Sequence, residues 1–397
     1  MPIVFGVILL DLIGFGIVIP ILPFLSPQLG ATKMDIALII VSYAVFAGLS
    51  GPFWGRLSDR IGRKPVIMIC LVGAALSYVM LGLANSLWMI YAARAFAGVM
   101  AGNFGVASAM MADVTSAENR ARGMGLIGAA FGLGMVLGPM LGGLLSGDSA
   151  SFTLPCIVAG GMSLLAVAAA ALFLPESLSP EKREENRRKL AQRERQSFYA
   201  LLRDTGNRLF VLQFVLHTAG VSIITYLFPL WMGDMLSWGA REVGIVFGIQ
   251  GALMVVFQAG LMGPLVRLLG EWPLLRIALS AYLVGFVSAV FAQDKYVMIC
   301  SMFLAMTGAT LCMPLLNTIV SHRTRIEYRG RIMGITSAAA SWGRVVGPLV
   351  AGFFLEAFGY RGAWLAGAAI VACYLTWAVT TDSSSLESGT QMDDVQN

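Results

Sequence analysis

The sequence predicts an all-α membrane protein, with twelve transmembrane helices arranged as two parallel six-helix repeats. The composition is 57% hydrophobic and 12% charged, whereas soluble domains are about 45–50% apolar and about 25% charged. Apolar runs of spanning length recur from end to end, and one run in the second half repeats a run in the first. A soluble protein of 397 residues would need more charged residues to cover its surface, so an ordinary cytosolic fold is excluded.

The apolar runs, taken in chain order, define the twelve helices. About 20 apolar residues span a bilayer as a helix, and continuous runs argue against barrel strands, in which hydrophobicity alternates. No basic residue precedes the first run, so we expect it to be retained rather than cleaved as a signal. The expected spans are 3–25, 36–55, 65–84, 87–111, 123–146, 153–174, 208–232, 242–265, 273–292, 296–320, 332–355 and 360–380.

A charged segment divides the twelve runs into two groups of six. We therefore expect an N-terminal six-helix bundle at 1–174, a cytoplasmic linker at 175–207, a C-terminal six-helix bundle at 208–380 and a cytoplasmic polar tail at 381–397. The linker mixes glutamates with lysines and arginines, which is typical of a solvated connector.

The basic residues lie mostly on one side of the predicted membrane. The opposite loops hold only Lys33, Arg241, Lys295 and Arg361. By the positive-inside rule, both termini and the linker are cytoplasmic. The net charge of +5 then reflects topology and contact with anionic lipids, and no nucleic-acid partner is expected.

The run at 123–146 is repeated at 332–355. The stretch from Glu118 to Gly143 matches the stretch from Glu327 to Gly352 in constant register, and both contain Gly-Pro at the same place. The two copies stand six helices apart and so cross the membrane in the same direction. Parallel six-helix halves are typical of secondary transporters whose substrate site lies between the halves, near the midplane.

The loop after the second run carries a recognisable signature. It reads Gly55-Arg-Leu-Ser-Asp59-Arg60-Ile-Gly62-Arg63-Lys64, which resembles the G-x-x-x-D-R-x-G-R-K loop of the major facilitator superfamily. The resemblance implies that Gly55, Asp59, Arg60, Gly62 and Arg63 form a conformational latch that holds one access state. Asp59 can accept bonds from a helix amino terminus or an arginine, whereas a role in topology alone would account well for Arg63 and Lys64.

A second signature lies in the fifth run. Its residues Gly134, Gly138, Pro139, Gly142 and Gly143 resemble the antiporter motif of the drug:proton exchangers of that superfamily. Glycines four residues apart let helices approach closely in lipid, and proline bends a helix. Plain close packing is the alternative reading. The first and fourth runs also resemble this twelve-helix group, especially its tetracycline exporters.

Charges within the predicted spans are the sharpest indication of function, because such charges are costly and usually face a cavity or a partner. Asp11 is the one acidic residue well inside a run, and Arg94 and Arg344 are the two cations. Asp11 and Arg94 are the expected proton-coupling residues: a proton and a substrate would compete for Asp11. A fixed Asp11–Arg94 pair joining two helices is the alternative.

Other polar and aromatic residues within the runs are candidates for the substrate cavity. Arg344 would suit an anionic or zwitterionic compound, and His217 could line the path or simply pack. The remaining candidates could orient or stack on a ligand, or could be ordinary core residues: Phe15, Asn103, Phe104, Gln213, Tyr226, Gln250, Gln258, Asn317 and Trp342.

The second half departs from the tetracycline exporters at two positions. Met254 stands where some members have a histidine, and Tyr282 stands where they have an acidic residue. We therefore expect proton handling to depend chiefly on Asp11.

Enzymatic and metal sites are not expected. The sequence has no P-loop lysine motif, no H-E-x-x-H and no C-x-x-C among its five cysteines, so neither cofactor nor metal is predicted. We expect a monomeric, proton-coupled antiporter in the bacterial inner membrane that exports small amphipathic compounds or drugs by alternating access, in contact with protons and lipids. A metabolite importer or facilitator, and a non-transporting receptor or scaffold, are the alternatives.

Overall fold

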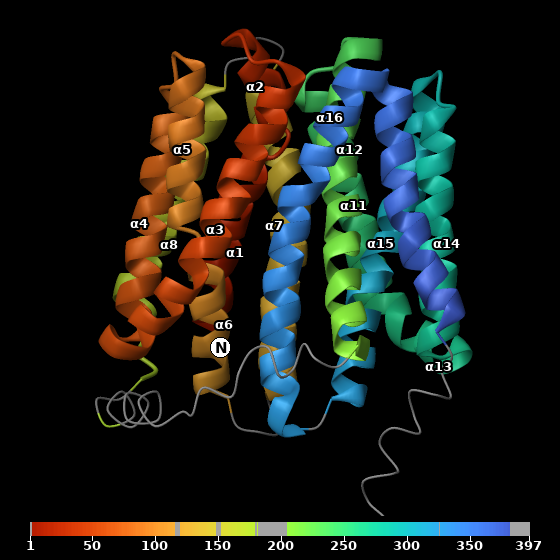
Figure 1. Ribbon diagram of the computed structural model, residues 1–397. Coiled ribbons are helices and arrows are strands. Elements are labelled where there is room, and N and C mark those ends of the chain that lie inside the picture. The colour runs from red at the N-terminus through yellow and green to blue at the C-terminus, as the bar shows by residue number, and fades with distance from the viewer. Residues whose placement is uncertain are drawn as a thin grey trace, which may run out of the picture. The chain divides into compact units, whose positions relative to one another are not determined.

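In a computed structural model, the described residues are 2–115, 120–147, 152–178, 181, 205–324 and 326–381, and their regular elements are all helices (Figure 1). The elements are α1 (Pro2–Val18), α2 (Leu22–Gln28), α3 (Lys33–Ile61), α4 (Arg63–Gly82), α5 (Leu87–Val99), α6 (Asn103–Asp113), α7 (Arg120–Ser146), α8 (Thr153–Phe173), α11 (Thr205–Leu236), α12 (Ala240–Val255), the π-helix η1 (Val256–Leu261), α13 (Met262–Leu269), α14 (Glu271–Val290), α15 (Lys295–Arg323) and α16 (Ile326–Thr380).

The described helices confirm the predicted membrane-spanning class. Ten are long and apolar enough to cross a bilayer, and α1 and α2, bent by 45° at a short break, form an eleventh span. The long α16 is two helices joined at Gly359, whose positive φ of 67° interrupts the helical backbone. Counting its two parts separately recovers the twelve predicted spans.

The chain divides into two compact units. The first comprises residues 1–196 and 229–252, and the second comprises 197–228 and 253–397. In the first unit, α1 packs against α7 and α8, α4 packs against α8, and α3 packs against α5. In the second, α14 packs against α15 and α16. The predicted linker and tail lie largely outside the described residues.

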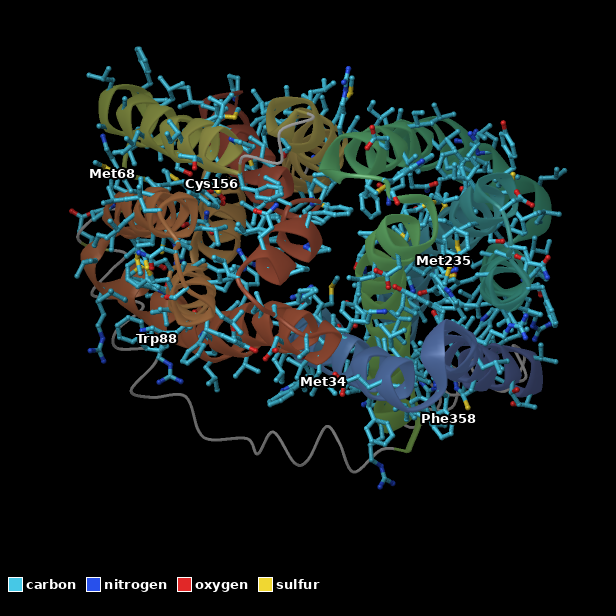
Figure 2. The ribbon with its side chains drawn as sticks, turned by 90° about the horizontal axis from the view of Figure 1, so that it is seen from above. Met34, Met68, Trp88, Cys156, Met235 and Phe358 are labelled. Carbon is cyan, nitrogen blue, oxygen red and sulfur yellow. The ribbon has the colours of Figure 1, made fainter. Side chains whose placement is uncertain are left out.

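Large apolar side chains cover much of the outside of each unit. Seen along the helices, Cys156 lies inside the first unit, whereas Trp88 lies at its periphery (Figure 2). Trp88 is 73% exposed and Leu172 is 76% exposed. Many exposed large apolar side chains of this kind indicate contact with an apolar partner, which for a multi-pass membrane protein is lipid.

Glycines of the antiporter-like motif bring α7 against α1 at backbone distance. A Cβ added to Gly138 would lie 2.5 Å from the Cα of Gly16, and one added to Gly142 would lie 2.2 Å from the carbonyl oxygen of Ile17. Real Cβ atoms do not approach backbone so closely, so these positions require glycine. The motif therefore packs directly against the helix that carries Asp11.

The same close glycine packing occurs in the second half of the chain. On α16, a Cβ at Gly343 would lie 2.4 Å from the carbonyl oxygen of Val215, and one at Gly347 would lie 2.4 Å from that of Ala219. Since α16 repeats α7 in sequence, glycine packing against the first helix of the half is common to both halves.

The predicted span at 87–111 is broken in the structure into α5 and α6. Side chains of α3 bond the carbonyls released at the break: Trp54 Nε1 donates to the Val99 oxygen at 2.5 Å, and Ser50 Oγ donates to the Gly98 oxygen at 3.1 Å. A Cβ on Gly102 would lie 2.3 Å from Trp54 Cγ. The break therefore depends on a neighbouring helix, which hydropathy alone does not reveal.

We expect Gly138→Ala to destabilise the protein, because neither Gly16 nor α1 as a whole can move away without repacking. Overpacking typically costs about 1–3 kcal/mol, which should lower the apparent Tm of the purified protein. Gly128→Ala is the matched control on α7, since nothing lies within 4 Å of its Cβ position. Equal thermal stability of the two variants would contradict the proposed contact.

Candidate functional site

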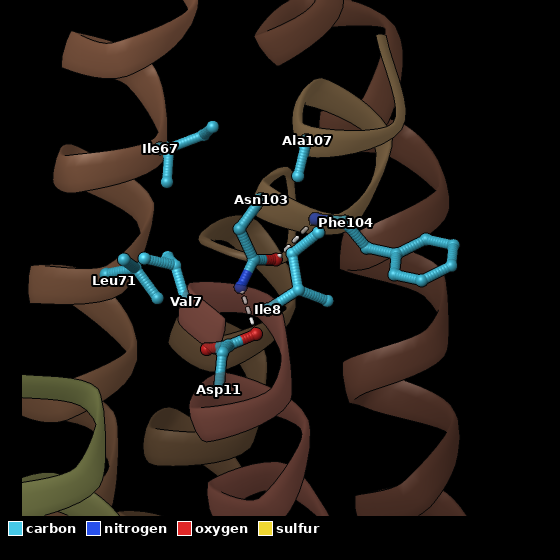
Figure 3. Close-up of a pocket in the computed structure, with 8 residues that line it drawn as sticks. All are labelled: Val7, Ile8, Asp11, Ile67, Leu71, Asn103, Phe104 and Ala107. Carbon is cyan, nitrogen blue, oxygen red and sulfur yellow. Dashed lines mark hydrogen bonds between the residues drawn. The ribbon is translucent and has the colours of Figure 1, made fainter. Parts of the chain in front are cut away.

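Asp11 lies on α1 in a small pocket of the first unit, where Asn103 is its hydrogen-bond partner (Figure 3). The Asn103 amide nitrogen donates to Asp11 Oδ2. The Asn103 amide oxygen accepts from the backbone N–H of Phe104 at 2.9 Å. With both ends engaged, the amide is held with its donor toward the carboxylate.

The pocket around Asp11 has mainly apolar walls and little free space. Its volume is about 10 Å³, close to what one water molecule needs. The ring of Phe104 points away from the carboxylate (Figure 3). The remaining lining residues are Val7, Ile8, Ile67, Leu71 and Ala107. A water-sized space beside a half-buried carboxyl group suits the delivery or removal of a proton.

The break between α5 and α6 explains why a polar group faces Asp11. Asn103 is the first residue of α6, and the amino-terminal end of a helix carries partial positive charge. The amide donor and this helix end favour the ionised carboxylate, whereas the apolar walls favour the neutral acid. The pocket therefore combines groups that stabilise the ionised form of Asp11 with walls that stabilise its neutral form. Such a balance lets the carboxyl group change its protonation state.

The alternative of a fixed Asp11–Arg94 pair is wrong: among the described residues, no salt bridge joins these two side chains. The Arg94 side chain is buried on α5, with its guanidinium carbon 4.4 Å from the centroid of the Tyr43 ring. This is a cation–π contact. Its Nε has no hydrogen-bond partner among the described residues. A proton-coupling role for Arg94 stays a prediction.

A second charged cluster lies where α3 meets α4. Arg63 is buried there, with its Nη2 2.8 Å from Asp59 Oδ1 and its Nε 3.1 Å from Asp113 Oδ2. Its Nη1 also donates to Ser58 Oγ at 2.6 Å. Two partners were expected for Asp59, a helix amino terminus and an arginine, and in the structure Asp59 pairs with the arginine. Asp113, at the last residue of α6, was missed because it reads in sequence as a charge at a helix end.

The amino terminus of α4 is capped by Glu176 rather than by Asp59. The Glu176 carboxylate accepts from the backbone N–H groups of Arg63 at 3.0 Å, Lys64 at 3.2 Å and Leu178 at 3.0 Å. Negative charge at a helix amino terminus is stabilising. In the sequence, this glutamate lies in the predicted solvated linker, where nothing marks it as a helix cap.

The other predicted latch residues have different surroundings. Gly62 has a φ of 111°, which favours glycine and turns the chain from α3 into α4. Gly55 has nothing within 4 Å of its Cβ position, and Arg60 is exposed. The latch role of the whole set stays a prediction.

Glycine packing extends from the antiporter-like motif to α12. A Cβ on Gly143 would lie 2.7 Å from the carbonyl oxygen of Ala240, and one on Gly244 would lie 2.5 Å from that of Pro139. Gln250, also on α12, is 3% exposed, and neither polar atom of its amide has a hydrogen-bond partner among the described residues. Its assignment to a substrate cavity stays a prediction.

Several predicted cavity residues of the second unit lie inside the helix packing. His217 is 4% exposed, and its ring centroid lies 6.2 Å from those of Tyr282 and Tyr374. The Tyr282 hydroxyl donates to the His217 carbonyl at 3.3 Å. Gln213 and Tyr226 are also buried. The His217 ring therefore lies against aromatic side chains of α14 and α16, so the packing reading of His217 matches its surroundings.

The remaining candidates are less deeply placed. The ring centroid of Phe15 lies 5.4 Å from that of Tyr43, and the Gln258 amide donates to the Thr310 carbonyl at 3.5 Å. Asn317 is half-buried. Trp342 and Arg344 are exposed on α16. Among the described residues, no group of three or more His, Cys, Asp or Glu side chains could hold a metal ion.

Apolar helices of spanning length, a sequence repeat between the two halves and the carboxyl group of Asp11 within a span are typical of a polytopic secondary transporter. The model of the Major Facilitator Superfamily matches residues 4–337 and 296–393 of the sequence. The chain belongs to this family. It is therefore a membrane carrier of small molecules and not an enzyme.

Curated relatives cover nearly the whole chain. It is 30% identical over 375 residues to the tetracycline resistance protein, class C, of Escherichia coli, which covers 93% of each chain. It is 27% identical over 352 residues to multidrug resistance protein 2 of Bacillus subtilis (strain 168), which covers 87% of this chain and 86% of that one.

Solved structures share the fold. The nucleoside transporter NupG matches with a TM-score of 0.74 at 14% identity, covering 96% of this chain and 100% of that one. A D-xylose-proton symporter matches with a TM-score of 0.75 at 15% identity, covering 95% and 96%. At these identities the likeness concerns the fold alone.

We expect Asn103→Ala to move the pH profile of transport upward. Without the amide donor, the ionised form of Asp11 loses a hydrogen bond of about 1.5–3 kcal/mol, equivalent to about 1–2 pH units. Transport by purified protein in liposomes, measured from pH 5 to 9, tests this. Ser108→Ala is the control on α6, because the Ser108 hydroxyl donates to the Phe104 carbonyl at 2.8 Å within the same helix. An unmoved profile would mean that the amide does not act on Asp11.

We expect Glu176→Ala to weaken the junction of α3 and α4, because three backbone N–H groups lose their acceptor. Loss of a helix cap costs about 0.5–2 kcal/mol, which a thermal-shift assay should detect as a lower apparent Tm. Glu181→Gln, at an exposed position five residues later, should leave the Tm unchanged. The capping role is excluded if both variants behave alike.

Proposed function

We propose that this chain is a proton-coupled antiporter that exports small amphipathic compounds or drugs, and that a proton and the substrate compete for Asp11. The observation that carries the proposal is the surroundings of Asp11: apolar walls, one neutral amide donor and a water-sized space. No salt bridge to Asp11 is present among the described residues, so no resident cation neutralises its charge.

A carboxylate of this kind can couple two fluxes. An ionised carboxylate is costly among apolar side chains, so the bundle reorients at lower cost when a proton, or a charge carried by the substrate, neutralises the site. One proton moving inward across about 100 mV supplies about 2.3 kcal/mol. That suffices to export a compound against a modest gradient without nucleotide hydrolysis.

The packing of α1 supports a coupling role for this helix. The glycines of α7 contact α1 at backbone distance, on the stretch that follows Asp11. Pro139 interrupts the hydrogen bonding of α7 in the same region. A change in the tilt of α1 therefore has to be accommodated by α7, which also packs against α12.

The direction of transport is proposed from the relatives. Relatives are named for resistance to tetracycline, to quinolones and to several drugs, and a carrier confers resistance most directly by export. The importer or facilitator alternative shares the fold but has no such support. We further propose that the protein acts as a monomer in a bacterial inner membrane, in contact with its lipids and with both termini in the cytoplasm.

We expect Asp11→Asn to abolish export driven by a pH gradient, because a neutral amide can neither bind nor release the proton. Asp11→Glu should retain part of the activity, since it keeps the acid but adds a methylene to a tight pocket. Uptake into inside-out vesicles with an imposed pH gradient measures both variants. Gel filtration and ligand binding check that they are folded.

The same measurement separates the alternatives. Transport by the wild-type protein that ignores the gradient contradicts proton coupling. Ligand binding with no flux at all favours the non-transporting receptor or scaffold.

A further inference from the structure

Arg94 is a buried charge inside the first unit. Its side chain is 6% exposed, and its guanidinium carbon lies 4.4 Å from the centroid of the Tyr43 ring. Tyr43 stands about 15 Å along α3 from Lys33, the first residue of that helix. The guanidinium is therefore held within the membrane-spanning part of the unit, where a charge is costly and usually faces a cavity or a partner.

The surroundings of Arg94 do little to offset that cost. Its Nε is fully buried without a hydrogen-bond partner, and no salt bridge reaches the guanidinium from any other residue that the structure describes. The ionisable groups near it are those of Tyr43, Tyr78 and Cys156, and phenols and thiols are neutral at pH 7. The face of an aromatic ring attracts a cation but does not neutralise its charge. Arg94 is therefore without an anionic partner among the described residues.

Arg94 acts through a permanent charge. A guanidinium keeps its proton in proteins, so it cannot release and rebind the proton that the proposed antiporter exchanges. It offers five N–H donors in a planar fork, and the two oxygens of a carboxylate accept two of these side by side. A carboxylate is therefore the anionic group that the guanidinium matches best in geometry as well as in charge.

Two aromatic rings connect Arg94 to the helix that carries Asp11. The ring centroid of Phe15 lies 5.4 Å from that of Tyr43, at an interplanar angle of 34°. Phe15 follows Asp11 by four residues on α1, so the two share one face of that helix, and both are half-buried. The series formed by Asp11, Phe15, Tyr43 and Arg94 therefore has a carboxyl group at one end, a cation at the other and two rings between them.

We propose that Arg94 is a subsite for a carboxylate of the transported compound, with Phe15 and Tyr43 against its aromatic part and Asp11 near its cationic end. The preferred substrate class is then aromatic zwitterions, which carry an ammonium group and a carboxylate at opposite ends of a flat ring system, rather than simple lipophilic cations. Such a compound neutralises both buried charges at once. The subsite concerns the cargo of the proposed exporter and so rests on the proposed function.

The test uses two fluorescent compounds with one ring system. Norfloxacin carries an ammonium group and a carboxylate at neutral pH, whereas its methyl ester keeps only the ammonium group. Binding of each compound to the purified full-length protein is measured by fluorescence anisotropy in magnesium-free buffer. We expect the wild-type protein to prefer norfloxacin, and Arg94→Gln to weaken its binding by about tenfold or more, as for loss of a charge-assisted hydrogen bond. Binding of the ester should change less than about twofold.

Two further variants control for misfolding and for charge alone. Arg94→Lys keeps the charge but loses the fork, so it should give an intermediate loss for norfloxacin and leave binding of the ester unchanged. Asp11→Asn should weaken both compounds, because both carry the ammonium group. If the wild-type protein does not prefer norfloxacin, or if Arg94→Gln and Arg94→Lys each weaken both compounds equally, Arg94 serves the packing of the unit and the subsite is refuted.

The outcomes for the subsite and for the proposed function can be told apart. Discrimination between norfloxacin and its ester that depends on Arg94, together with flux indifferent to a pH gradient, would keep the subsite and reject proton coupling. Gradient-driven flux that depends on Asp11, with no discrimination between the two compounds, would reject the subsite and keep the exporter.

Discussion

The cost of an ionised carboxylate among apolar side chains is the constraint on which the arrangement of the first unit depends. Asp11 would be expensive in any span packed only by aliphatic residues. The protein offsets part of this cost with one amide from Asn103 and leaves the rest uncompensated. A group held in that balance responds to the arrival of a proton or a cation, whereas a group paired with a permanent cation would not.

The amide of Asn103 faces Asp11 at a break in the predicted span, where α5 ends and α6 begins. The carbonyls released where α5 ends are bonded by Ser50 and Trp54 of α3, and α6 then begins at Asn103. The same short helix ends at Asp113, which bonds Arg63 in the charged cluster between α3 and α4. One rigid helix thus joins the partner of Asp11 to the cluster that contains the loop signature.

Glycine spacing serves a different purpose in this fold. In lipid there is little hydrophobic drive for helices to associate, so close van der Waals contact has to supply the stability. The contacts of Gly138 with Gly16 and of Gly347 with Ala219 show one solution used in both halves. Packing that close leaves α7 and α16 few ways to move independently of α1 and α11, which suits a carrier whose helices have to tilt together.

The sequence by itself determined the class of the protein, since span length, charge distribution and an internal repeat depend on local composition and need no knowledge of contacts. It also singled out Asp11 and Arg63, because charge in a span or a signature loop is visible in one dimension. Only the tertiary structure decided the partners. Asn103 rather than Arg94 bonds Asp11, and Glu176 rather than Asp59 caps α4. These partners depend on where helices break and on which helix faces meet in space. Neither property can be read from the local sequence around residues that lie far apart in the chain.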